Sequence, residues 1–292
     1  MFLPRKILEE KLLRILAEDA GQGDVTTALV VPASTTVEAE IVAKESGTVA
    51  GMEETRIILE CLGLRAEAMV NDRDSIEPKQ ALFRIIGDAR TILSAERTML
   101  NLLSRMSGIA TTTKELVEKI RKAHLKTRVA CTRKTAPGLL YFDKKAVHVG
   151  GGDTHRLHLD DMVLIKDNHV AIVGSIEKAV QTAREGASFS KKIEVEATRV
   201  DDVLIAAKAG ADVIMLDNFS PKQVEDACGL LKKAKLYGTV LLEASGGITS
   251  ETILRFASTG VDIVSLGEIT DNPRPLDMSL EVSNVKKINQ KT

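Results

Sequence analysis

The chain has 292 residues, a formal net charge of −1 and 44% hydrophobic residues, a composition that suits one large or two ordinary folded domains. The balanced charge and the lack of Trp argue against a general role in binding nucleic acid or membrane surfaces. Three scattered cysteines without a CxxC pair argue against a zinc site or a disulfide framework, and they favour a reducing, cytoplasmic setting.

The first 108 residues keep helix signals apart from strand signals. Helices are predicted over residues 5–18, 53–63 and 89–108, and strands within residues 36–51 and over 81–87. The first of these helices mixes apolar and charged positions, so it is predicted to be amphipathic and not a signal peptide. The sequence contains no run of about 18 apolar residues, so no membrane span is predicted. The pattern predicts an N-terminal α+β domain.

Beyond residue 108, short apolar runs alternate with helical stretches. The apolar runs cover residues 128–131, 146–149, 162–165, 192–195, 212–216, 239–244 and 262–266. Helices are predicted over residues 175–187, 200–211, 220–235 and 249–260, with Gly210 and Gly260 as caps. Nearly continuous apolar strands separated by helices predict a parallel sheet that is covered on both faces.

We favour a seven-stranded barrel over an open sheet. Chemically distinctive residues follow every apolar run, and a barrel brings the ends of all its strands to one face. An open sheet would instead concentrate the functional residues at a single switch point.

Two adjacent cations, Arg133 and Lys134, follow the first apolar run. Neighbouring residues on a regular strand point to opposite faces, so both side chains can bind one ligand only if the strand has already ended. We therefore predict that residues 132–135 form a loop and that Pro137 and Gly138 complete the turn.

The ends of the later runs differ in chemistry from one sector to the next. The second and third supply the cations His155, Arg156 and Lys166, which together suit a ligand with more than one carboxylate. The fourth and fifth supply Glu194, Glu196 and Asp217. Glu196 and Asp217 could hold Mg²⁺, which is usually bound by one or two carboxylates and substrate phosphates.

The sixth and seventh runs end in small residues, namely Ser245, Gly246, Gly247 and Gly267. The first three precede a predicted helix with Thr249 or Ser250 as N-cap, and exposed N–H groups on such a turn attract phosphate. The strand ends together predict a site for a dianionic small molecule, a metal and a phosphorylated partner.

Each feature taken alone has a simpler explanation. A single cation at a strand end is most often a solvated loop charge, and Glu194 or Glu196 could be polar rim residues. His155 and His158 form an HxxH pair, but no further ligand motif supports a metal site there. Lys166 could be the Schiff-base lysine of a barrel aldolase. The joint occurrence across successive strand ends favours the single site.

The chain resembles the quinolinate phosphoribosyltransferase family, also called decarboxylating nicotinate-nucleotide pyrophosphorylases. The resemblance rests on stretches that run almost from end to end, including AERTMLNLLSRMSGIAT (95–111), TRKTAPGLLYFDKKAV (132–147), GGGDTHRLHLDD (150–161), LIKDNH (164–169), IEVEA (193–197), MLDN (215–218) and ASGGI (244–248). It implies transfer of a phosphoribosyl group from 5-phosphoribosyl 1-pyrophosphate to quinolinate with decarboxylation, in NAD biosynthesis, with Mg²⁺ as cofactor.

The resemblance also implies the architecture. The expected fold is an N-terminal α/β sandwich domain over residues 1–108 and an incomplete seven-stranded α/β barrel over residues 109–272, with the tail 273–292 packed on the first domain. A homodimer with shared active sites is the expected minimal unit, and a hexamer is the larger alternative. In the family, the Arg of the ERT motif, here Arg97, reaches into the neighbouring subunit's site.

The family's functional positions map onto this chain residue by residue. The substrate-binding positions are Arg97, Arg133, Lys134, His155, Arg156 and Lys166. The positions implied for catalysis are Lys134, Lys166, Glu196 and Asp217, and the last two are also the metal positions. The phosphate positions are Ser245, Gly246, Gly247 and Gly267.

One position departs from the family pattern. The family commonly continues G-x-L-T-H-S, whereas this chain has Asp271 where His is expected, and an anion there should repel a phosphate. Four alternatives stay open: a nicotinate-specific phosphoribosyltransferase, a related pyrophosphorylase-like protein of molybdenum systems, the aldolase already mentioned, and a non-catalytic phosphate-sensing module. The dense set of cations argues against recognition of a single carboxylate.

Overall fold

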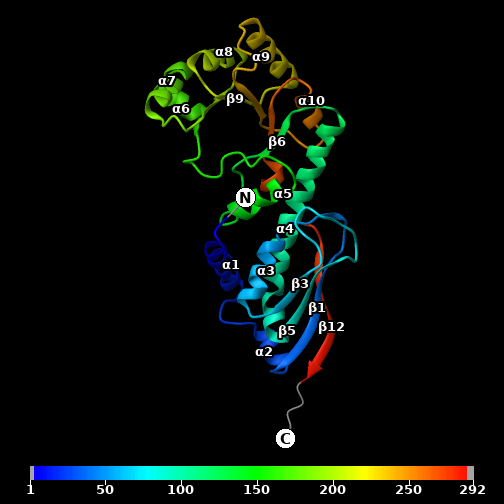
Figure 1. The fold of residues 1–292 in the computed structure, drawn as a ribbon. Coiled ribbons are helices and arrows are strands. Elements are labelled where there is room, and N and C mark those ends of the chain that lie inside the picture. The colour runs from blue at the N-terminus through cyan, green and yellow to red at the C-terminus, as the bar shows by residue number, and fades with distance from the viewer. Residues whose placement is uncertain (1–2, 288–292) are drawn as a thin grey trace. The chain divides into compact units, whose positions relative to one another are not determined.

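The computed structural model describes residues 3–287 and divides them into two compact units (Figure 1). The first unit contains the residues up to Thr112, residues 148–150 and the residues from Pro273 onward. The second unit contains residues 113–147 and 151–272. No helix in the described part of the chain is long and apolar enough to cross a membrane.

An antiparallel sheet forms the centre of the first unit. Its strands, in spatial order, are β12 (Met278–Lys287), β1 (Thr35–Ala43), β5 (Ala81–Asp88) and β3 (Arg65–Ala68). Buried and half-exposed residues alternate along the first seven residues of β1, so one face of the sheet carries the core. Because β12 pairs with β1, residues from the two ends of the chain lie side by side here (Figure 1).

Helices and one short strand pair complete the first unit. These elements are α1 (Arg5–Ala20), α2 (Val25–Val30), α3 (Met52–Cys61), the first part of α4 (Ala89–Lys122), and β2 (Gly47–Thr48) paired with β4 (Ser75–Ile76). The sequence did not predict β3, because its residues are mostly exposed and show no apolar alternation.

Helix α4 is longer than the sequence predicts. The prediction ended this helix at Gly108, but it continues to Lys122 and contributes residues to both units. Gly108 is buried, and a Cβ atom there would lie 2.0 Å from the backbone oxygen of Arg274. Glycine is required at this position because two backbone segments pack closely, and it does not mark the end of the helix.

The second unit is built on a parallel sheet. Its six strands, in spatial order, are β6 (Arg128–Cys131), β11 (Ile263–Leu266), β10 (Leu241–Ser245), β9 (Val213–Asp217), β8 (Ile193–Ala197) and β7 (Val163–Ile165). Every neighbouring pair is parallel, so the carboxyl ends of all six strands lie along one edge.

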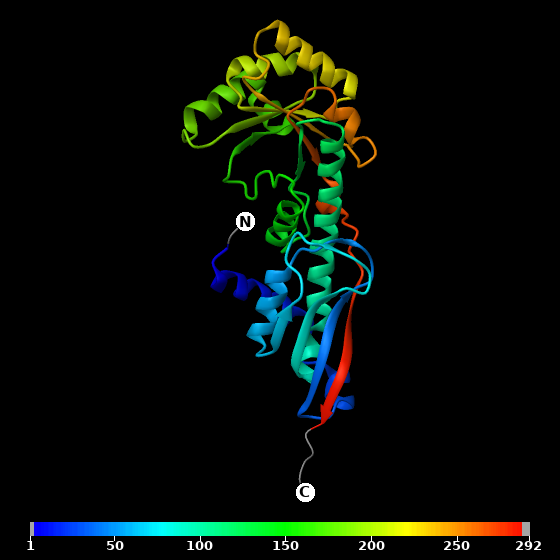
Figure 2. The same ribbon diagram turned by 45° about the vertical axis from the view of Figure 1, so that its right-hand side comes forward.

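Seven helices belong to this unit in addition to the end of α4. They are α5 (Leu140–Val149), α6 (Asp167–Val173), α7 (Ile176–Gly186), α8 (Val200–Ala209), α9 (Pro221–Lys233), α10 (Ile253–Ala257) and α11 (Glu268–Asp271) within the described residues. Helices α7, α8 and α9 lie side by side along the outside of the sheet (Figure 2). Gly210 ends α8 in the left-handed conformation, as predicted, whereas α10 ends at Ala257, before Gly260.

The barrel-like parallel architecture is confirmed. Among the residues that the structure describes, however, the parallel sheet has six strands and not the expected seven. Residues 146–149, predicted as a strand, form the last turn of α5. Periodicity cannot distinguish a four-residue apolar run in a strand from one on a buried helix, and here the helix is the outcome. Beside β6, at the expected place of a seventh strand, Asp153 makes a single parallel bridge with Ala130.

Replacing Gly108 by Ala should lower the free energy of unfolding by about 1–3 kcal/mol, because the new methyl group must displace the backbone at Arg274. Thermal and urea unfolding measure this effect. The matched control is Gly229→Ala in α9, where a Cβ atom meets open space, and where Ala should stabilise the helix by about 0.5–1 kcal/mol. Equal stability of Gly108→Ala and the unmodified protein would contradict the close packing.

Candidate active site

The loop predicted after the first strand of the barrel-like unit is confirmed. Strand β6 ends at Cys131, and residues 132–135 are irregular. The turn at Pro137 and Gly138 follows, with Gly138 in the left-handed region at φ 82°. Arg133 and Lys134 consequently both reach the same cavity, although they are adjacent in sequence.

A cavity of about 430 Å³ lies at the carboxyl ends of the parallel strands. It is lined by cationic, acidic and small residues that the strand-end pattern singled out. These residues are Arg133, Lys134, His155, Arg156, Lys166, Glu196, Asp217, Ser245, Gly246, Gly247 and Gly267. Segments as far apart in sequence as residues 133 and 267 therefore meet around one space.

Four residues from the sequence analysis do not line this cavity. Arg97 is an exposed residue of α4 within the first unit. His158 is exposed, and its backbone N–H donates to Asp161, so the HxxH pair does not converge. Asp271 ends the short helix α11 outside the cavity lining. Glu194 lies deeper, beneath His155.

Glu196 and Lys166 form an ion pair at the acidic side of the cavity. The Lys166 Nζ atom lies 3.0 Å from Glu196 Oε1, and the backbone N–H of Asp167 donates to the other carboxylate oxygen at 3.4 Å. The Glu196 side chain is 10% exposed, whereas that of Lys166 is 50% exposed. The half-exposed amine is therefore fixed at the rim of the cavity by the more buried carboxylate.

Glu196 and Asp217 are suited to share a cation. Burial raises the pKa of Asp217, and the charge of Glu196 raises it further. This mutual repulsion is the condition that a divalent cation relieves, and carboxylates are the ligands that Mg²⁺ prefers. Asn218, in the left-handed conformation, donates to Asp217 at 2.9 Å and so orients the carboxylate.

The glycine-rich turn after β10 packs tightly on the turn after β9. A Cβ atom on Gly246 would lie 2.3 Å from Asn218 Oδ1, and the φ of Gly246 is 90°. Only glycine fits both requirements. This tight turn lines the cavity directly beside Asp217, which pairs with Ser245 across the two strands.

The expected helix start after this turn is wrong. Helix α10 begins at Ile253 with Thr252 as its N-cap, whereas Thr249 or Ser250 was predicted. The Ser250 N–H already donates to Glu268 Oε1 at 2.7 Å, so this group is not available to a phosphate. A carboxylate from a distant segment satisfies the N–H group, and the local sequence pattern gave no indication of it.

Lys134 lies against the last glycine of the cavity. A Cβ atom on Gly267 would be 3.2 Å from Lys134 Cδ and 3.7 Å from Lys134 Nζ. The Lys134 backbone carbonyl also accepts a hydrogen bond from Thr270 Oγ1 at 2.7 Å. The ammonium group is thus held at the glycine-rich wall of the cavity.

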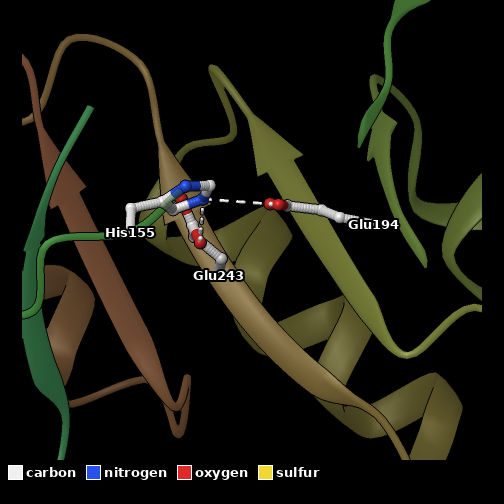
Figure 3. A group of neighbouring side chains, drawn as sticks. All are labelled: His155, Glu194 and Glu243. Carbon is white, nitrogen blue, oxygen red and sulfur yellow. Dashed lines mark ion pairs between the residues drawn. The ribbon is translucent and has the colours of Figure 1, made fainter. Parts of the chain in front are cut away.

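His155 is clamped between two buried carboxylates (Figure 3). Its Nε2 atom lies 3.3 Å from Glu194 Oε2 on β8 and 3.4 Å from Glu243 Oε2 on β10. The side chains of Glu194 and Glu243 are 0% and 1% exposed. Glu194 and Glu243 belong to the strands on either side of β9, so the ring bridges across that strand.

Burial by itself lowers the pKa of His155, but the hydrogen bonds and charges of Glu194 and Glu243 outweigh it and raise the pKa to about 9. One contact acts in the opposite direction, because the Arg156 N–H donates to His155 Nδ1 at 2.7 Å and an imidazolium cannot accept this bond. A single neutral hydrogen bond contributes about 0.5–1.5 kcal/mol, roughly one pKa unit. The two carboxylates therefore dominate.

The strand-end pattern did not single out Glu243, and it gave Glu194 no specific role. Burial raises the pKa of Glu194, and the charge of Glu243 adds to this effect. The available signal was a charged residue inside an apolar strand, since Glu243 is flanked by Leu242 and Ala244. A carboxylate at such a position must find a partner in the folded protein, here the imidazole.

The charge state of His155 sets a specific pH dependence of stability. The folded-state pKa lies above the usual value near 6.5, so the stabilisation is full below about pH 6.5 and is lost as pH rises through about 9. Glu243→Gln should lower the His155 pKa and move this loss to lower pH. NMR titration of the His155 ring measures it, with Glu177→Gln on the exposed face of α7 as control. An unchanged midpoint in Glu243→Gln would count against the clamp.

Comparisons with known proteins identify the family of the chain. Residues 24–107 match the model of the quinolinate phosphoribosyl transferase N-terminal domain, and residues 109–281 match that of its C-terminal domain. A probable nicotinate-nucleotide pyrophosphorylase (carboxylating) of Methanothermobacter thermautotrophicus is 44% identical over 272 residues, which are 93% of this chain and 98% of that protein. The human nicotinate-nucleotide pyrophosphorylase (carboxylating) is 37% identical over 256 residues, covering 86% of each chain.

The solved structures give the same result. The nicotinate-nucleotide pyrophosphorylase of Francisella tularensis superposes with a TM-score of 0.87 at 36% identity, and the match covers 97% of this chain and 98% of that one. The two domain models, the two relatives and the Francisella tularensis structure each match this chain, and together they cover most of its length. The chain therefore belongs to the quinolinate phosphoribosyl transferase family.

Proposed function

We propose that this protein transfers a phosphoribosyl group from 5-phosphoribosyl 1-pyrophosphate to quinolinate, with loss of CO₂, to give nicotinate mononucleotide and pyrophosphate in NAD biosynthesis. The relatives' name, nicotinate-nucleotide pyrophosphorylase (carboxylating), describes the same reaction in reverse. The observation that carries the proposal is the cavity itself, in which cations, a carboxylate pair and a glycine-rich wall occupy different sectors.

The cationic wall is the proposed site of the pyridine dicarboxylate. Arg133, His155 and Arg156 line it, and guanidinium groups bind carboxylates through two parallel hydrogen bonds. Lys166 approaches from the acidic side, where Glu196 holds its amine. A ligand with two carboxylates would balance this concentration of positive charge better than one with a single carboxylate.

The acidic and glycine-rich walls are the proposed site of the sugar phosphate. Glu196 and Asp217 are the proposed Mg²⁺ ligands and ribose-pyrophosphate contacts. Mg²⁺ bound there would neutralise charge on the leaving pyrophosphate. Ser245, Gly246, Gly247 and Gly267 line the wall proposed to hold the 5′-phosphate, and Lys134 lies against Gly267 with its ammonium group.

The proposed chemistry begins with attack by the pyridine nitrogen. Its lone pair forms the bond to the anomeric carbon as the carbon–oxygen bond to pyrophosphate breaks, through an oxocarbenium-like state. The nitrogen needs no base, so the residues act by positioning the reactants and by stabilising charge. Lys134 and Lys166, which line the cavity at the glycine-rich and acidic sides, are proposed to offset negative charge on the reacting phosphate groups.

Decarboxylation follows from the charge created in the first step. The quaternised nitrogen stabilises the electron pair left on the adjacent ring carbon when its bond to CO₂ breaks, and that carbon then accepts a proton. The site should therefore hold the remaining carboxylate firmly and the departing one weakly. The clamped His155 suits the first task, because its carboxylate partners fix the ring.

The active unit is proposed to be a homodimer, with a hexamer as the larger alternative. Support comes from Arg97, which lies exposed on α4 within the ERT motif shared with the family. We propose that it completes the neighbouring subunit's quinolinate site. The cytoplasm is the proposed location, since all three cysteines are free thiols.

Arg133→Ala and Arg156→Ala should each raise the KM for quinolinate strongly. Each change removes a charge-assisted hydrogen bond worth about 1.5–3 kcal/mol, which corresponds to roughly 10- to 150-fold. Steady-state kinetics with each substrate varied in turn measures the effect. The matched control is Arg199→Ala, an arginine with a side chain 74% exposed and outside the cavity lining. Unchanged quinolinate KM in both cavity variants would refute the dicarboxylate site.

Mixing two inactive variants should restore activity if sites are shared between subunits. At quinolinate concentrations far below their raised KM values, Arg97→Ala and Arg133→Ala are each expected to have little activity as homodimers. In a mixed dimer, the site of the Arg97→Ala subunit has its own Arg133 and receives an intact Arg97 from its partner. Recovery of up to about half of the per-dimer activity after subunit exchange supports the proposal, and no recovery counts against the crossing arginine.

Substrate choice separates the remaining candidate functions. In assays with 5-phosphoribosyl 1-pyrophosphate, release of pyrophosphate and CO₂ when quinolinate is present, and no release of pyrophosphate when nicotinate is present, distinguishes this activity from that of a nicotinate-specific transferase. An aldolase using Lys166 would be trapped by borohydride in the presence of a carbonyl substrate. The Lys166 Nζ atom is paired with Glu196 at 3.0 Å, so a carbonyl substrate would have to displace this contact before the amine could attack it.

A further inference from the structure

Lys144 on α5 is a buried lysine that the proposed chemistry does not use. Its side chain is completely buried, and it is among the largest fully buried side chains of the described residues. It does not line the active-site cavity. Burial lowers the pKa of its amine, and a hydrogen bond with Cys131 only partly opposes this effect. Placing an amine at such a position is costly, so its contacts need an explanation.

The contacts of Lys144 converge on one backbone carbonyl. Its Nζ atom donates a hydrogen bond to the carbonyl oxygen of Thr154. The thiol of Cys131, at the end of β6, donates to the same oxygen at 3.4 Å. Both donors are buried, so this carbonyl is held from helix α5 and from strand β6 at once.

Thr154 directly precedes the two cationic residues His155 and Arg156. His155 has a φ of 51°, in the left-handed region, which is uncommon for residues other than Gly even though His adopts it more readily than most. Its N–H donates to Asp153 Oδ1 at 2.9 Å, and the Arg156 N–H donates to His155 Nδ1 at 2.7 Å. The segment is thus a strained turn that depends on its neighbours for its shape.

The His155 ring is clamped by Glu194 and Glu243, but the backbone of this segment has little pairing with the sheet. Within the described residues its backbone joins the parallel sheet through the single bridge between Asp153 and Ala130, and not through a regular strand. A regular barrel strand would be fixed by a ladder of several backbone bonds. Side-chain donors therefore have to supply the fixation that the ladder provides elsewhere in the sheet.

We propose that Lys144, together with the Cys131 thiol, is a positioning residue that holds the Thr154 carbonyl and thereby sets His155 and Arg156 in the geometry that recognises the dicarboxylate. Lys144 does not touch the substrate, and it acts through the backbone of residues 154–156. This inference rests on the proposed function for the identity of the ligand, but the positioning itself can be measured without it.

The first test compares Lys144→Met with Phe142→Leu. Met keeps much of the volume of Lys and removes the donor, while Phe142 is equally buried on the same helix and is replaced by a smaller residue. Both variants should lower the melting temperature. Only Lys144→Met should raise the KM for quinolinate, by about tenfold or more, and leave the KM for 5-phosphoribosyl 1-pyrophosphate within about twofold. Equal effects on both KM values, or no effect on either, would overturn the proposal.

A second pair of variants avoids a large change in the core. Cys131→Ala removes the other donor to Thr154, whereas Cys131→Ser keeps one. The Ala variant should raise the quinolinate KM several-fold, and the Ser variant should restore most of it. If Ser and Ala behave alike, the hydrogen bond to Thr154 has no positioning role.

Hydrogen exchange tests the positioning independently of turnover. Lys144→Met should speed amide exchange at residues 155 and 156, whose N–H groups are bonded within the turn, and Phe142→Leu should leave it unchanged. Unchanged exchange in Lys144→Met overturns the inference even if the enzyme is active on quinolinate. If exchange accelerates but the unmodified protein does not turn over quinolinate, the proposed function fails and the positioning role stands.

Discussion

The parallel pairing of the six strands from β6 to β11 is the constraint on which the site depends. Because every neighbouring pair is parallel, the residues that follow the strands all lie at one edge of the sheet. Arg133, Lys166, Asp217 and Gly246 are distant in sequence, and this single geometric condition brings them around one cavity. A change in strand order would leave the same residues without a common ligand.

The carboxylates at the strand ends pair with two different cations. Glu194 and Glu243 are almost fully buried and clamp His155, and Glu243 also lines the cavity. Glu196 lies two residues beyond Glu194 on β8, level with Glu243 in the strand register, and it holds Lys166. Residues two apart on a strand point to the same face, so β8 supplies a carboxylate to each cation.

The region between β6 and β7 is the least regular part of the unit, and it carries recognition residues. Asp153 makes only one bridge to β6, and the following turn has a strained residue at His155. Lys144 and Cys131 donate hydrogen bonds to the Thr154 carbonyl and so add to the fixation of this segment. Catalytic and binding residues are common on loops because loops can adopt such shapes, provided that a rigid scaffold holds them.

The sequence by itself determined the alternation of strands and helices, the loop at residues 132–135 and the chemical type of each strand end, because these depend on local periodicity and residue type. It did not distinguish the apolar end of α5 from a strand, and it did not show that Gly108 lies inside a helix against Arg274. Only the tertiary structure decided that Glu243 faces His155, that Glu268 occupies the Ser250 N–H and that Lys144 reaches Thr154. These contacts join residues that are 10 to 88 positions apart, and their existence depends on burial and strand register, which no local pattern encodes.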